Sequence, residues 1–353
     1  MIKKGNKVVI DGAIITTKSI PEELMKKMRS SIIFAGALIG RFKEATFSYP
    51  GGCDIGSRPI DLHLEGFEKL GVKIEKEAGY IKCTCEELRG AEINLDFPSV
   101  GATENIMMAA VLAKGETVIH NAAMEPEVED LAKFLNKMGA KITGAGTNKL
   151  VIEGVADLKG IGYTIMPDRI EAATMLCATA ITGGKVRLEN VEPEHISPAI
   201  YKLQEAGCKI KIEKRSVYID APRRLTAIDI KTMPYPGFAT DMQSMFGAML
   251  TTAKGTSVIV ETIFENRFKY VNGLNKMGAK IVGAGCNGIA IKGVRNLSGA
   301  EVEATDLRAG ATMIVAGLAA KGRTTVENIE HILRGYVDID KKLNALGARI
   351  TRG

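Results

Sequence analysis

The feature that most constrains the fold is an internal repeat with a period near 69 residues. A short motif recurs: leucine, methionine or alanine, then glycine, a small residue, lysine or arginine, and isoleucine. Because glycine commonly ends a helix and isoleucine favours a strand, each copy predicts an amphipathic helix followed by a strand. Second strands that complete hairpins are expected at Lys149–Glu153, Ser216–Ala221 and Gly288–Lys292. The copies of the motif are Leu70–Ile74, Met138–Ile142, Ala206–Ile210, Met277–Ile281 and Leu346–Ile350.

Alanine- and methionine-rich runs form a second element with the same period. Apolar residues occupy nearly every face of these runs, which is typical of helices buried on all sides. The runs are Ser30–Ile39, Ala102–Ala113, Ile170–Ile181, Asp241–Ala253 and Ala309–Ala320. Most end in glycine before a β-branched strand, at Gly115–His120, Gly184–Val191, Gly255–Glu261 and Gly322–Ile329. We therefore expect an α/β fold with buried helices inside outward-facing sheets, that is, an inside-out α/β barrel.

The repeats also predict the domain organisation. A weak break at Thr164–Pro167 leaves two buried runs before it and three after it. Two domains are expected, 1–166 and 167–353, and if they are built alike the first has lost a unit. The chain opens with a strand-like Lys7–Ile10 and an expected helix at Pro21–Met28, so it begins in mid-unit.

Composition argues against several classes of protein. No run approaches about 18 apolar residues, so no transmembrane helix is expected, and the start lacks the apolar core of a signal peptide. Six scattered cysteines favour reduced thiols in the cytoplasm. The net charge of +6 suits acidic small substrates, and no basic stripe with interleaved aromatics suggests nucleic acid. Neither Cys83 and Cys85 nor the histidines have the spacing of a metal site.

One stretch, Tyr49–Leu62, combines a glycine-rich loop, a cysteine and a helix start. Its glycines permit backbone conformations closed to other residues, and Pro59 suits the first turn of a helix. Cys53 precedes Arg58 by five residues. The guanidinium and the helix dipole would favour an anion there and lower the pKa of the Cys53 thiol. The alternative interpretation is a surface loop with an incidental cysteine.

From about Val8 to Ile350, a set of motifs resembles one enzyme family. The motifs are Met28–Ser30, Pro50–Cys53, Arg58–Leu62, Ser99–Thr103, Glu125–Glu127, Pro167–Glu171, Phe238–Gln243, Glu261–Phe268, Ala304–Ala309 and His331–Tyr336. On these residues the chain resembles the enolpyruvyl transferases, and among them the UDP-N-acetylglucosamine 1-carboxyvinyltransferases.

The resemblance implies a fold, and it implies that one unit of that fold is missing from this chain. Family members have two domains, each of three inside-out α/β units, with the substrates between them. They also carry a further N-terminal unit, whose lysine–asparagine pair contacts phosphoenolpyruvate and the nucleotide sugar. Nothing in Met1–Lys27 matches that segment. The resemblance thus implies a chain without its first unit, of which little or no transferase activity is expected.

The family's reaction transfers the enolpyruvyl group of phosphoenolpyruvate to the 3-hydroxyl of UDP-N-acetylglucosamine and releases phosphate. This is the first committed step of peptidoglycan synthesis, and it uses no cofactor. The resemblance assigns Cys53 as the acid, which also forms an adduct with phosphoenolpyruvate and is the target of fosfomycin. Asp241 matches the base, with a helix cap as its alternative role. Arg58 and Arg334 match clamps for phosphate or carboxylate, which guanidinium groups bind in a forked geometry.

Further residues match the family's binding site. The implied contacts of the nucleotide sugar are Arg29, Arg58, Pro59, Ile60, Asp61, Leu62, Ser99, Val100, Gly101, Asp241 and Ile263. Residues expected behind these contacts or in domain closure are Asp168, Arg169, Arg267, Asp306 and Arg308. For the three arginines an ordinary ion pair is an equal alternative. Phe97 departs from the family, many of whose members have a lysine there.

Two other functions stay open. A sister enolpyruvyl transferase acts on shikimate 3-phosphate, but that branch does without the Cys53 loop. A chain without its first unit is also compatible with a non-catalytic protein that only binds nucleotide sugar. Gly144–Thr147 and Gly283–Cys286 resemble phosphate loops, but because they recur within the repeat we interpret them as hairpin turns.

Overall fold

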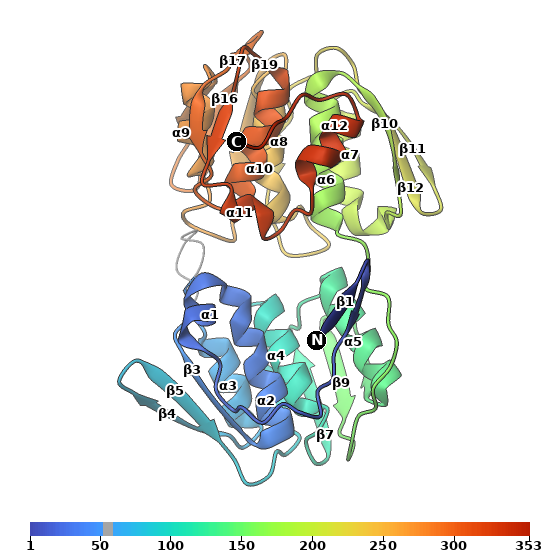
Figure 1. The fold of residues 1–353 in the computed structure, drawn as a ribbon, viewed down its shortest axis with the longest axis vertical. Helices are drawn as coiled ribbons and strands as arrows, with labels where there is room; N and C mark the ends of the chain where they lie inside the picture. Colours follow the sequence, from blue (N-terminus) through green and yellow to red (C-terminus); the bar gives the residue numbers. More distant parts are fainter. Residues whose placement is uncertain (52–58) are drawn as a thin grey trace. The chain divides into compact units, whose positions relative to one another are not determined.

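The computed structural model describes residues 1–51 and 59–353, which divide into two compact units (Figure 1). The first unit comprises residues 1–51, Pro59–Ala123 and Leu131–Gly162. The second comprises Met124–Asp130 and Tyr163–Gly353. No helix in these ranges is long and apolar enough to cross a membrane.

The first unit is built on helices α2 (Phe34–Phe42) and α4 (Val100–Ala110), which pack against each other. Helix α2 also contacts strand β3 (Glu44–Ser48), and α4 contacts β9 (Lys149–Glu153). The other elements are β1 (Ile2–Lys4), β2 (Lys7–Val9), α1 (Glu22–Lys27), the 3₁₀ helix η1 (Arg29–Ile33), α3 (Asp61–Lys69), β4 (Lys73–Glu77), β5 (Tyr80–Thr84), β6 (Glu92–Asn94), β7 (Glu116–His120) and β8 (Lys141–Thr143). Helix α5 (Pro126–Met138) belongs to the second unit up to Asp130 and to the first unit from Leu131. Two main sheets result, ordered β3-β5-β4 and β6-β7-β9-β8.

The second unit repeats this plan around α6 (Arg169–Thr182), α8 (Thr240–Leu250) and α10 (Leu307–Ala319), each of which packs against the other two. Its other elements are β10 (Lys185–Glu189), η2 (Pro193–Ile196), α7 (Ser197–Glu205), β11 (Lys209–Glu213), β12 (Ser216–Asp220), β13 (Ile230–Lys231), β14 (Thr256–Val260), α9 (Tyr270–Lys276), β15 (Lys280–Gly283), β16 (Gly288–Lys292), β17 (Leu297–Ser298), β18 (Glu301–Glu303), β19 (Ala320–Lys321), β20 (Thr325–Glu327), α11 (Glu330–Leu333) and α12 (Ile339–Ala345). The sheets are β10-β12-β11, β13-β14-β16-β15, β17-β19 and β18-β20.

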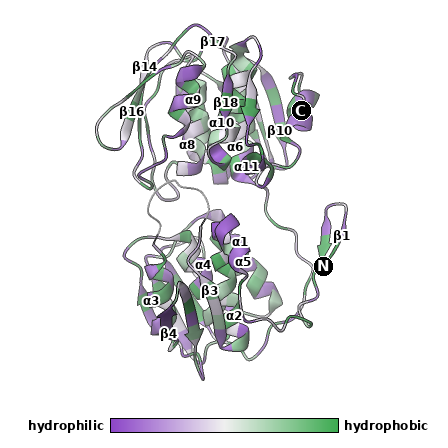
Figure 2. Cartoon of the chain, turned by 60° about the vertical axis from the view of Figure 1, so that its left-hand side comes forward, coloured by the Kyte–Doolittle hydropathy of each residue, from purple (hydrophilic) through white to green (hydrophobic). Residues whose placement is uncertain are grey.

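Burial explains this arrangement. Every residue of α8 from Met242 to Leu250 is buried, so the helix needs partners on all its faces. The sheets instead have one covered and one exposed face; β9, for example, alternates between buried and more exposed residues. Strand β4, with the sequence Lys-Ile-Glu-Lys-Glu, is almost wholly hydrophilic and exposed (Figure 2). The predicted inside-out α/β fold is confirmed.

The repeated glycine has one structural role. In all five copies the glycine follows a helix, and its φ is positive, between 88° and 110°. Residues other than glycine rarely adopt such values. The predicted hairpins are present after β8, β11 and β15. The stretches Gly144–Thr147 and Gly283–Cys286 lie at hairpin turns as expected. In the fifth copy the glycine ends α12, but no strand of the described chain follows it.

An asparagine three residues before this glycine completes the motif in three copies. The side chain of Asn275 donates to the carbonyl of Ile281 and accepts from its N–H, both at 3.1 Å. Asn136 makes the same pair with Ile142, and Asn344 makes it with Ile350, all at 2.8 Å. Since β8 and β15 are edge strands, the amide satisfies backbone groups that would otherwise be open to pairing with another chain.

The first buried run differs from the expectation of one helix over Ser30–Ile39. It begins as η1 and continues as α2, because the side chain of Asn105 enters the backbone hydrogen-bond ladder. Asn105 accepts from the N–H of Gly36 at 2.7 Å and donates to the carbonyl of Ile32 at 2.9 Å. These two backbone groups would otherwise bond to each other within a single α-helix.

The expected strand and helix near the N-terminus are both present. Helix α1 confirms the helix expected at Pro21–Met28. The strand expected at Lys7–Ile10 is β2, which pairs with β1 in a separate two-stranded sheet whose residues are all exposed. Ser19 instead forms a parallel bridge with Thr46 of β3, the position that β6 takes beside β7. Cys85 lies one residue beyond β5, which contains Cys83.

We predict that Asn275→Ala lowers the free energy of unfolding by about 1 kcal/mol, because two hydrogen bonds to the edge strand are lost. The variant should also aggregate more readily, because the outer edge of β15 is open. Asn272→Ala, on the exposed side of the same helix, is the matched control. Urea unfolding and light scattering measure both effects. Equal stability and solubility of the two variants would contradict the role of Asn275.

Candidate active site

In the first unit the predicted nucleotide-sugar residues lie at two helix starts and at η1. Ser99 caps α4, and its Oγ accepts from the N–H of Ala102 at 3.3 Å. Pro59 and Ile60 immediately precede α3, and Asp61 and Leu62 begin it. Arg29, at the start of η1, donates from Nη2 to the carbonyl of Pro59 at 3.4 Å.

A buried histidine and a buried asparagine join these elements. Nδ1 of His63, on α3, lies 2.9 Å from Nδ2 of Asn105, on α4. Burial, aided by the nearby Arg29, lowers the pKa of His63 to about 4, so the ring is neutral and Nδ1 can accept from the amide. A Cβ on Gly101 would lie 3.2 Å from Cε1 of His63, so glycine permits the close approach there. Sequence reasoning gave neither His63 nor Asn105 a role.

In the second unit, Asp241 is the centre of a polar cluster at the start of α8. Arg267 donates from Nη2 to Oδ1, and Arg308 donates from Nη2 to Oδ2 at 3.0 Å. Partial burial opposes ionisation, but the guanidiniums of Arg308 and Arg267 hold the pKa of the Asp241 carboxyl well below its usual range. The N-cap of α8 is Ala239, without a side-chain cap bond, so the alternative role of Asp241 as the cap is wrong.

Arg308 is held in turn by a directed chain of hydrogen bonds. Its Nη1 donates to the Tyr336 hydroxyl at 3.1 Å, and that oxygen lies 2.9 Å from Oγ1 of Thr174. Because the Thr174 hydroxyl donates to the carbonyl of Ile170, the Tyr336 hydroxyl has to donate to Thr174. Tyr336 is 1% exposed, so the chain is shielded from water. It ties the start of α10 to α6.

The other charged residues expected nearby have local partners. Asp168 and Asp306 are the N-caps of α6 and α10, and each accepts from two backbone N–H groups of the first turn. Arg169 donates from Nε to both oxygens of Glu127, at 2.9 and 3.2 Å. Its guanidinium also lies 5.7 Å from the ring centroid of Tyr235. These caps and pairs fix the starts of the helices that carry Arg169 and Arg308.

The remaining predicted residues lie outside these clusters. The N–H of Ile263 donates to Oε1 of Glu261 at 2.8 Å, which fixes the turn after β14. Arg334 is exposed at the end of α11, and Phe97 is also exposed. Cys53 and Arg58 lie outside the described residues. Two connected groups therefore include some of the predicted residues, one around His63 in the first unit and one around Asp241 in the second.

The described cysteines include three buried thiols. Burial raises the pKa of Cys83 to about 12 and that of Cys208 to about 11, and Cys177 is buried as well. Cys286 is exposed. Thiols with a raised pKa are poor nucleophiles at neutral pH. Within residues 1–51 and 59–353, no group of acidic, histidine and cysteine side chains could hold a metal ion.

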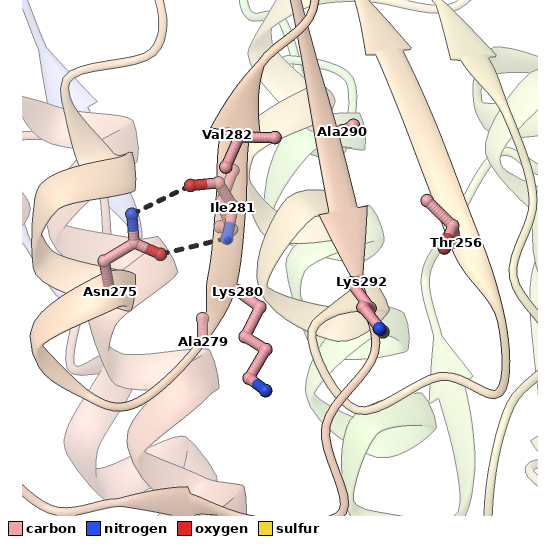
Figure 3. A pocket seen from close by; sticks show the side chains of 8 residues that line it. All are labelled: Thr256, Asn275, Ala279, Lys280, Ile281, Val282, Ala290 and Lys292. Carbon is pink, nitrogen blue, oxygen red and sulfur yellow. Dashed lines mark hydrogen bonds between the residues drawn. The ribbon is translucent and has the colours of Figure 1, made fainter.

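A hollow of about 520 Å³ lies on the β13-β14-β16-β15 sheet of the second unit (Figure 3). It is lined by Thr256, Asn275, Ala279, Lys280, Ile281, Val282, Ala290 and Lys292. Thr256 follows the end of α8, whereas Asp241 lies at its start. Lys280 and Lys292 are directly opposite in the register, where the first unit has the ion pair of Lys141 and Glu153. The hollow contains none of the predicted site residues.

Comparisons with known proteins agree on one family. Residues 1–343 match the family described as EPSP synthase (3-phosphoshikimate 1-carboxyvinyltransferase). UDP-N-acetylglucosamine 1-carboxyvinyltransferase 1 of Caldanaerobacter subterraneus is 56% identical over 332 residues, which is 94% of this chain and 80% of the relative. UDP-N-acetylglucosamine 1-carboxyvinyltransferase 2 of Clostridium tetani is 52% identical over 350 residues, 99% of this chain and 84% of the relative.

Solved structures support the same fold. The enolpyruvyl transferase NikO from Streptomyces tendae has a TM-score of 0.84 at 24% identity, over 96% of this chain and 81% of that one. EPSP synthase from Acinetobacter baumannii has a TM-score of 0.73 at 22% identity, over 92% of this chain and 79% of that one. At these identities the likeness is evidence of the fold alone.

We predict that Asp241→Asn lowers the free energy of unfolding at pH 7 by about 1–2 kcal/mol. This free-energy change is modest because the Asp241 side chain is 40% exposed, and water screens its ion pairs with Arg267 and Arg308. Because the folded pKa of Asp241 is depressed, its contribution is fully present above the unfolded value of about 3.9. The difference from wild type should therefore stay constant from pH 8 to pH 5 and shrink at lower pH.

Chemical denaturation at several pH values measures this difference. Glu265→Gln, an exposed change in the same stretch as Arg267, is the control and should alter stability little. A difference between wild type and Asp241→Asn that is as large at pH 3 as at pH 7 would contradict the ion pairs.

Proposed function

Because the chain belongs to the EPSP synthase family, and within it to the UDP-N-acetylglucosamine 1-carboxyvinyltransferases, we propose that it transfers the enolpyruvyl group of phosphoenolpyruvate to the 3-hydroxyl of UDP-N-acetylglucosamine. Phosphate is the second product. The reaction belongs to peptidoglycan synthesis and so to cell-wall formation, cell shape and division. The proposal places the protein in the cytoplasm, in keeping with its scattered cysteines.

The observation that carries the proposal is the cluster of arginines and helix starts around Asp241. Arg308 and Asp241 lie in the first turns of α10 and α8, and Tyr336 links Arg308 to α6, so the positive ends of these helices lie close together. Both proposed substrates are strongly anionic. Backbone N–H groups and guanidiniums at such a place favour bound phosphate and carboxylate, and they stabilise negative charge that develops during the reaction.

The proposed proton transfers balance as follows. Asp241 takes the proton of the 3-hydroxyl while the oxygen attacks C2 of phosphoenolpyruvate, and Cys53 supplies a proton to C3. The double bond is then restored when a proton from C3 returns to the Cys53 thiolate and the C2–O bond to phosphate breaks, the leaving phosphate taking up the proton held by Asp241. Arg58 and Arg334 neutralise the phosphate and the carboxylate of the substrate. The roles of Cys53, Arg58 and Arg334 rest on the resemblance alone.

Arg267 and Arg308 make the free carboxylate of Asp241 a weak base, because they favour its ionised form. In our proposal, the phosphate or carboxylate of phosphoenolpyruvate competes for these guanidiniums. The pKa of Asp241 rises as their pairing weakens, and the carboxylate can then accept the proton. The arginines thus couple substrate binding to the basicity of Asp241.

The proposed contacts of the nucleotide sugar occur in both units. The first unit supplies Arg29 and the residues at the starts of α3 and α4, and the second supplies Asp241 and Ile263. Domains 1–166 and 167–353 remain our proposed division of the chain. Arg169, Arg267 and Arg308, with the caps Asp168 and Asp306, act behind these contacts by holding the helix starts.

The named relatives do not favour the earlier expectation of little or no transferase activity. We therefore predict that the protein releases phosphate from phosphoenolpyruvate with UDP-N-acetylglucosamine and not with shikimate 3-phosphate. Asp241→Ala should lower kcat by about 100-fold or more, since the general base is removed. A colorimetric phosphate assay measures both effects, with Glu265→Gln as the control. Phosphate release with shikimate 3-phosphate would favour the sister activity. Binding of UDP-N-acetylglucosamine without any turnover would favour the non-catalytic alternative.

We also predict that fosfomycin alkylates Cys53. The buried thiols Cys83 and Cys208 should stay unmodified because of their raised pKa. Peptide mass mapping of the treated protein locates the adduct. Cys53→Ala should abolish labelling, whereas Cys286→Ala, which removes an exposed thiol, should leave it intact. An adduct on Cys286 in the wild type would overturn the assignment of Cys53.

A further inference from the structure

Glu261 is a buried carboxylate that lies directly after β14. It is 1% exposed. Oε1 accepts from the Thr232 hydroxyl and the N–H of Ile263, both at 2.8 Å, and from the N–H of Phe264 at 3.3 Å. Oε2 accepts from the Thr240 hydroxyl at 2.8 Å and from Nε2 of Gln243 at 3.3 Å. Both oxygens are therefore fully used inside the protein.

All five of these groups donate, which is the pattern that an ionised carboxylate fits. None of the donors carries a charge, and the ion pairs of the described chain do not include Glu261. Burying a carboxylate without a cation is costly unless hydrogen bonds compensate for the lost water. An apolar residue at this place would avoid that cost, so the carboxylate points to a role other than packing.

The two oxygens hold different segments. Oε1 binds the turn that contains Ile263, and Oε2 binds Thr240 and Gln243, which flank Asp241 in the first turn of α8. Gln243 is itself fixed, because its Oε1 accepts from the Tyr270 hydroxyl at 2.7 Å. Through its two oxygens, the carboxylate of Glu261 thus bridges the two segments directly.

We propose that Glu261 is a positioning residue that sets the Ile263 turn relative to Asp241. The inference rests on the proposed function, in which Ile263 and Asp241 contact the nucleotide sugar. Glu261 does not contact substrate, since its oxygens are buried and occupied. It acts by holding the base at a fixed place beside the sugar, and reaction rates are sensitive to misplacement of about 1 Å.

Glu261→Gln separates the two halves of this bridge. The remaining oxygen has to stay beside Ile263 and Phe264, because an amide NH₂ cannot accept from two backbone N–H groups. The NH₂ then faces Gln243, whose Nε2 can no longer donate and whose Oε1 is already engaged by Tyr270. The change therefore loosens the α8 side and spares the Ile263 turn.

We expect Glu261→Gln to lower kcat about 10-fold or more, with little change in KM for UDP-N-acetylglucosamine. Hydrogen exchange followed by mass spectrometry should be faster in residues 240–244 and unchanged in residues 262–264. A role in overall stability alone would lower the folded fraction and accelerate exchange throughout the second unit.

A double variant supplies the rescue. In Glu261→Gln with Gln243→Glu, the amide of residue 261 donates to the new carboxylate, which still accepts from Tyr270, while the Thr240 hydroxyl rotates to accept. The double variant should regain most of the lost kcat and normal exchange in residues 240–244. If Glu261→Gln fails to fold, Thr240→Val removes only one donor to Oε2, and Thr240→Ser is its conservative control.

The outcomes distinguish this inference from the proposed function. Wild-type exchange and wild-type kcat in Glu261→Gln, or in Thr240→Val where that variant is used, would overturn the positioning role. A wild-type protein that releases no phosphate with UDP-N-acetylglucosamine would count against the proposed function. The exchange measurement would still decide in that case whether Glu261 holds the first turn of α8.

Discussion

Helices α6, α8 and α10 are buried on nearly all faces, and the polar organisation of the second unit depends on that constraint. A buried helix can carry charge only at its ends, where backbone groups also lack partners. Asp168 and Asp306 satisfy the N–H groups at the starts of α6 and α10. Asp241, in the first turn of α8, does not cap the helix and pairs with Arg267 and Arg308. Packing thereby gathers the groups that a reaction between anions requires.

Much of the fold could be predicted because its signals are local. The repeated glycine needs a positive φ, and runs that are apolar on every face indicate buried helices. Helices, strands and hairpins could therefore be predicted from neighbouring residues. The break between η1 and α2 could not be predicted in this way. It depends on Asn105, which enters the helix from a run distant in the sequence. The repeated asparagine, at Asn136, Asn275 and Asn344, is also a local feature, but its hydrogen bonds to the backbone after the glycine are evident only in the folded chain.

Residues of the candidate site could be proposed from the sequence, and their roles stay predictions, whereas the connections between them could not be predicted. The family was identified correctly from short motifs, and its relatives match nearly the whole chain. Pairing of Asp241 with Arg308, or of His63 with Asn105, needs helices that meet only after folding. Glu261 belongs to the motif Glu261–Phe268, but no role could be predicted for it, because nothing in the local sequence indicates that one carboxylate bridges two segments. Cys53 and Arg58 lie outside the described residues, so their assignment still depends on resemblance.

The central claim is that Arg267 and Arg308 hold Asp241 as a weak base until an anionic substrate competes for them. The most direct test is a carbon NMR titration of protein labelled at the aspartate carboxyls, with Asp241→Asn to assign the signal. We predict a pKa for Asp241 below the ordinary value of about 3.9 in the free protein, and a higher pKa once phosphoenolpyruvate is added. An ordinary pKa in the free protein, or one that phosphoenolpyruvate leaves unchanged, would contradict the account.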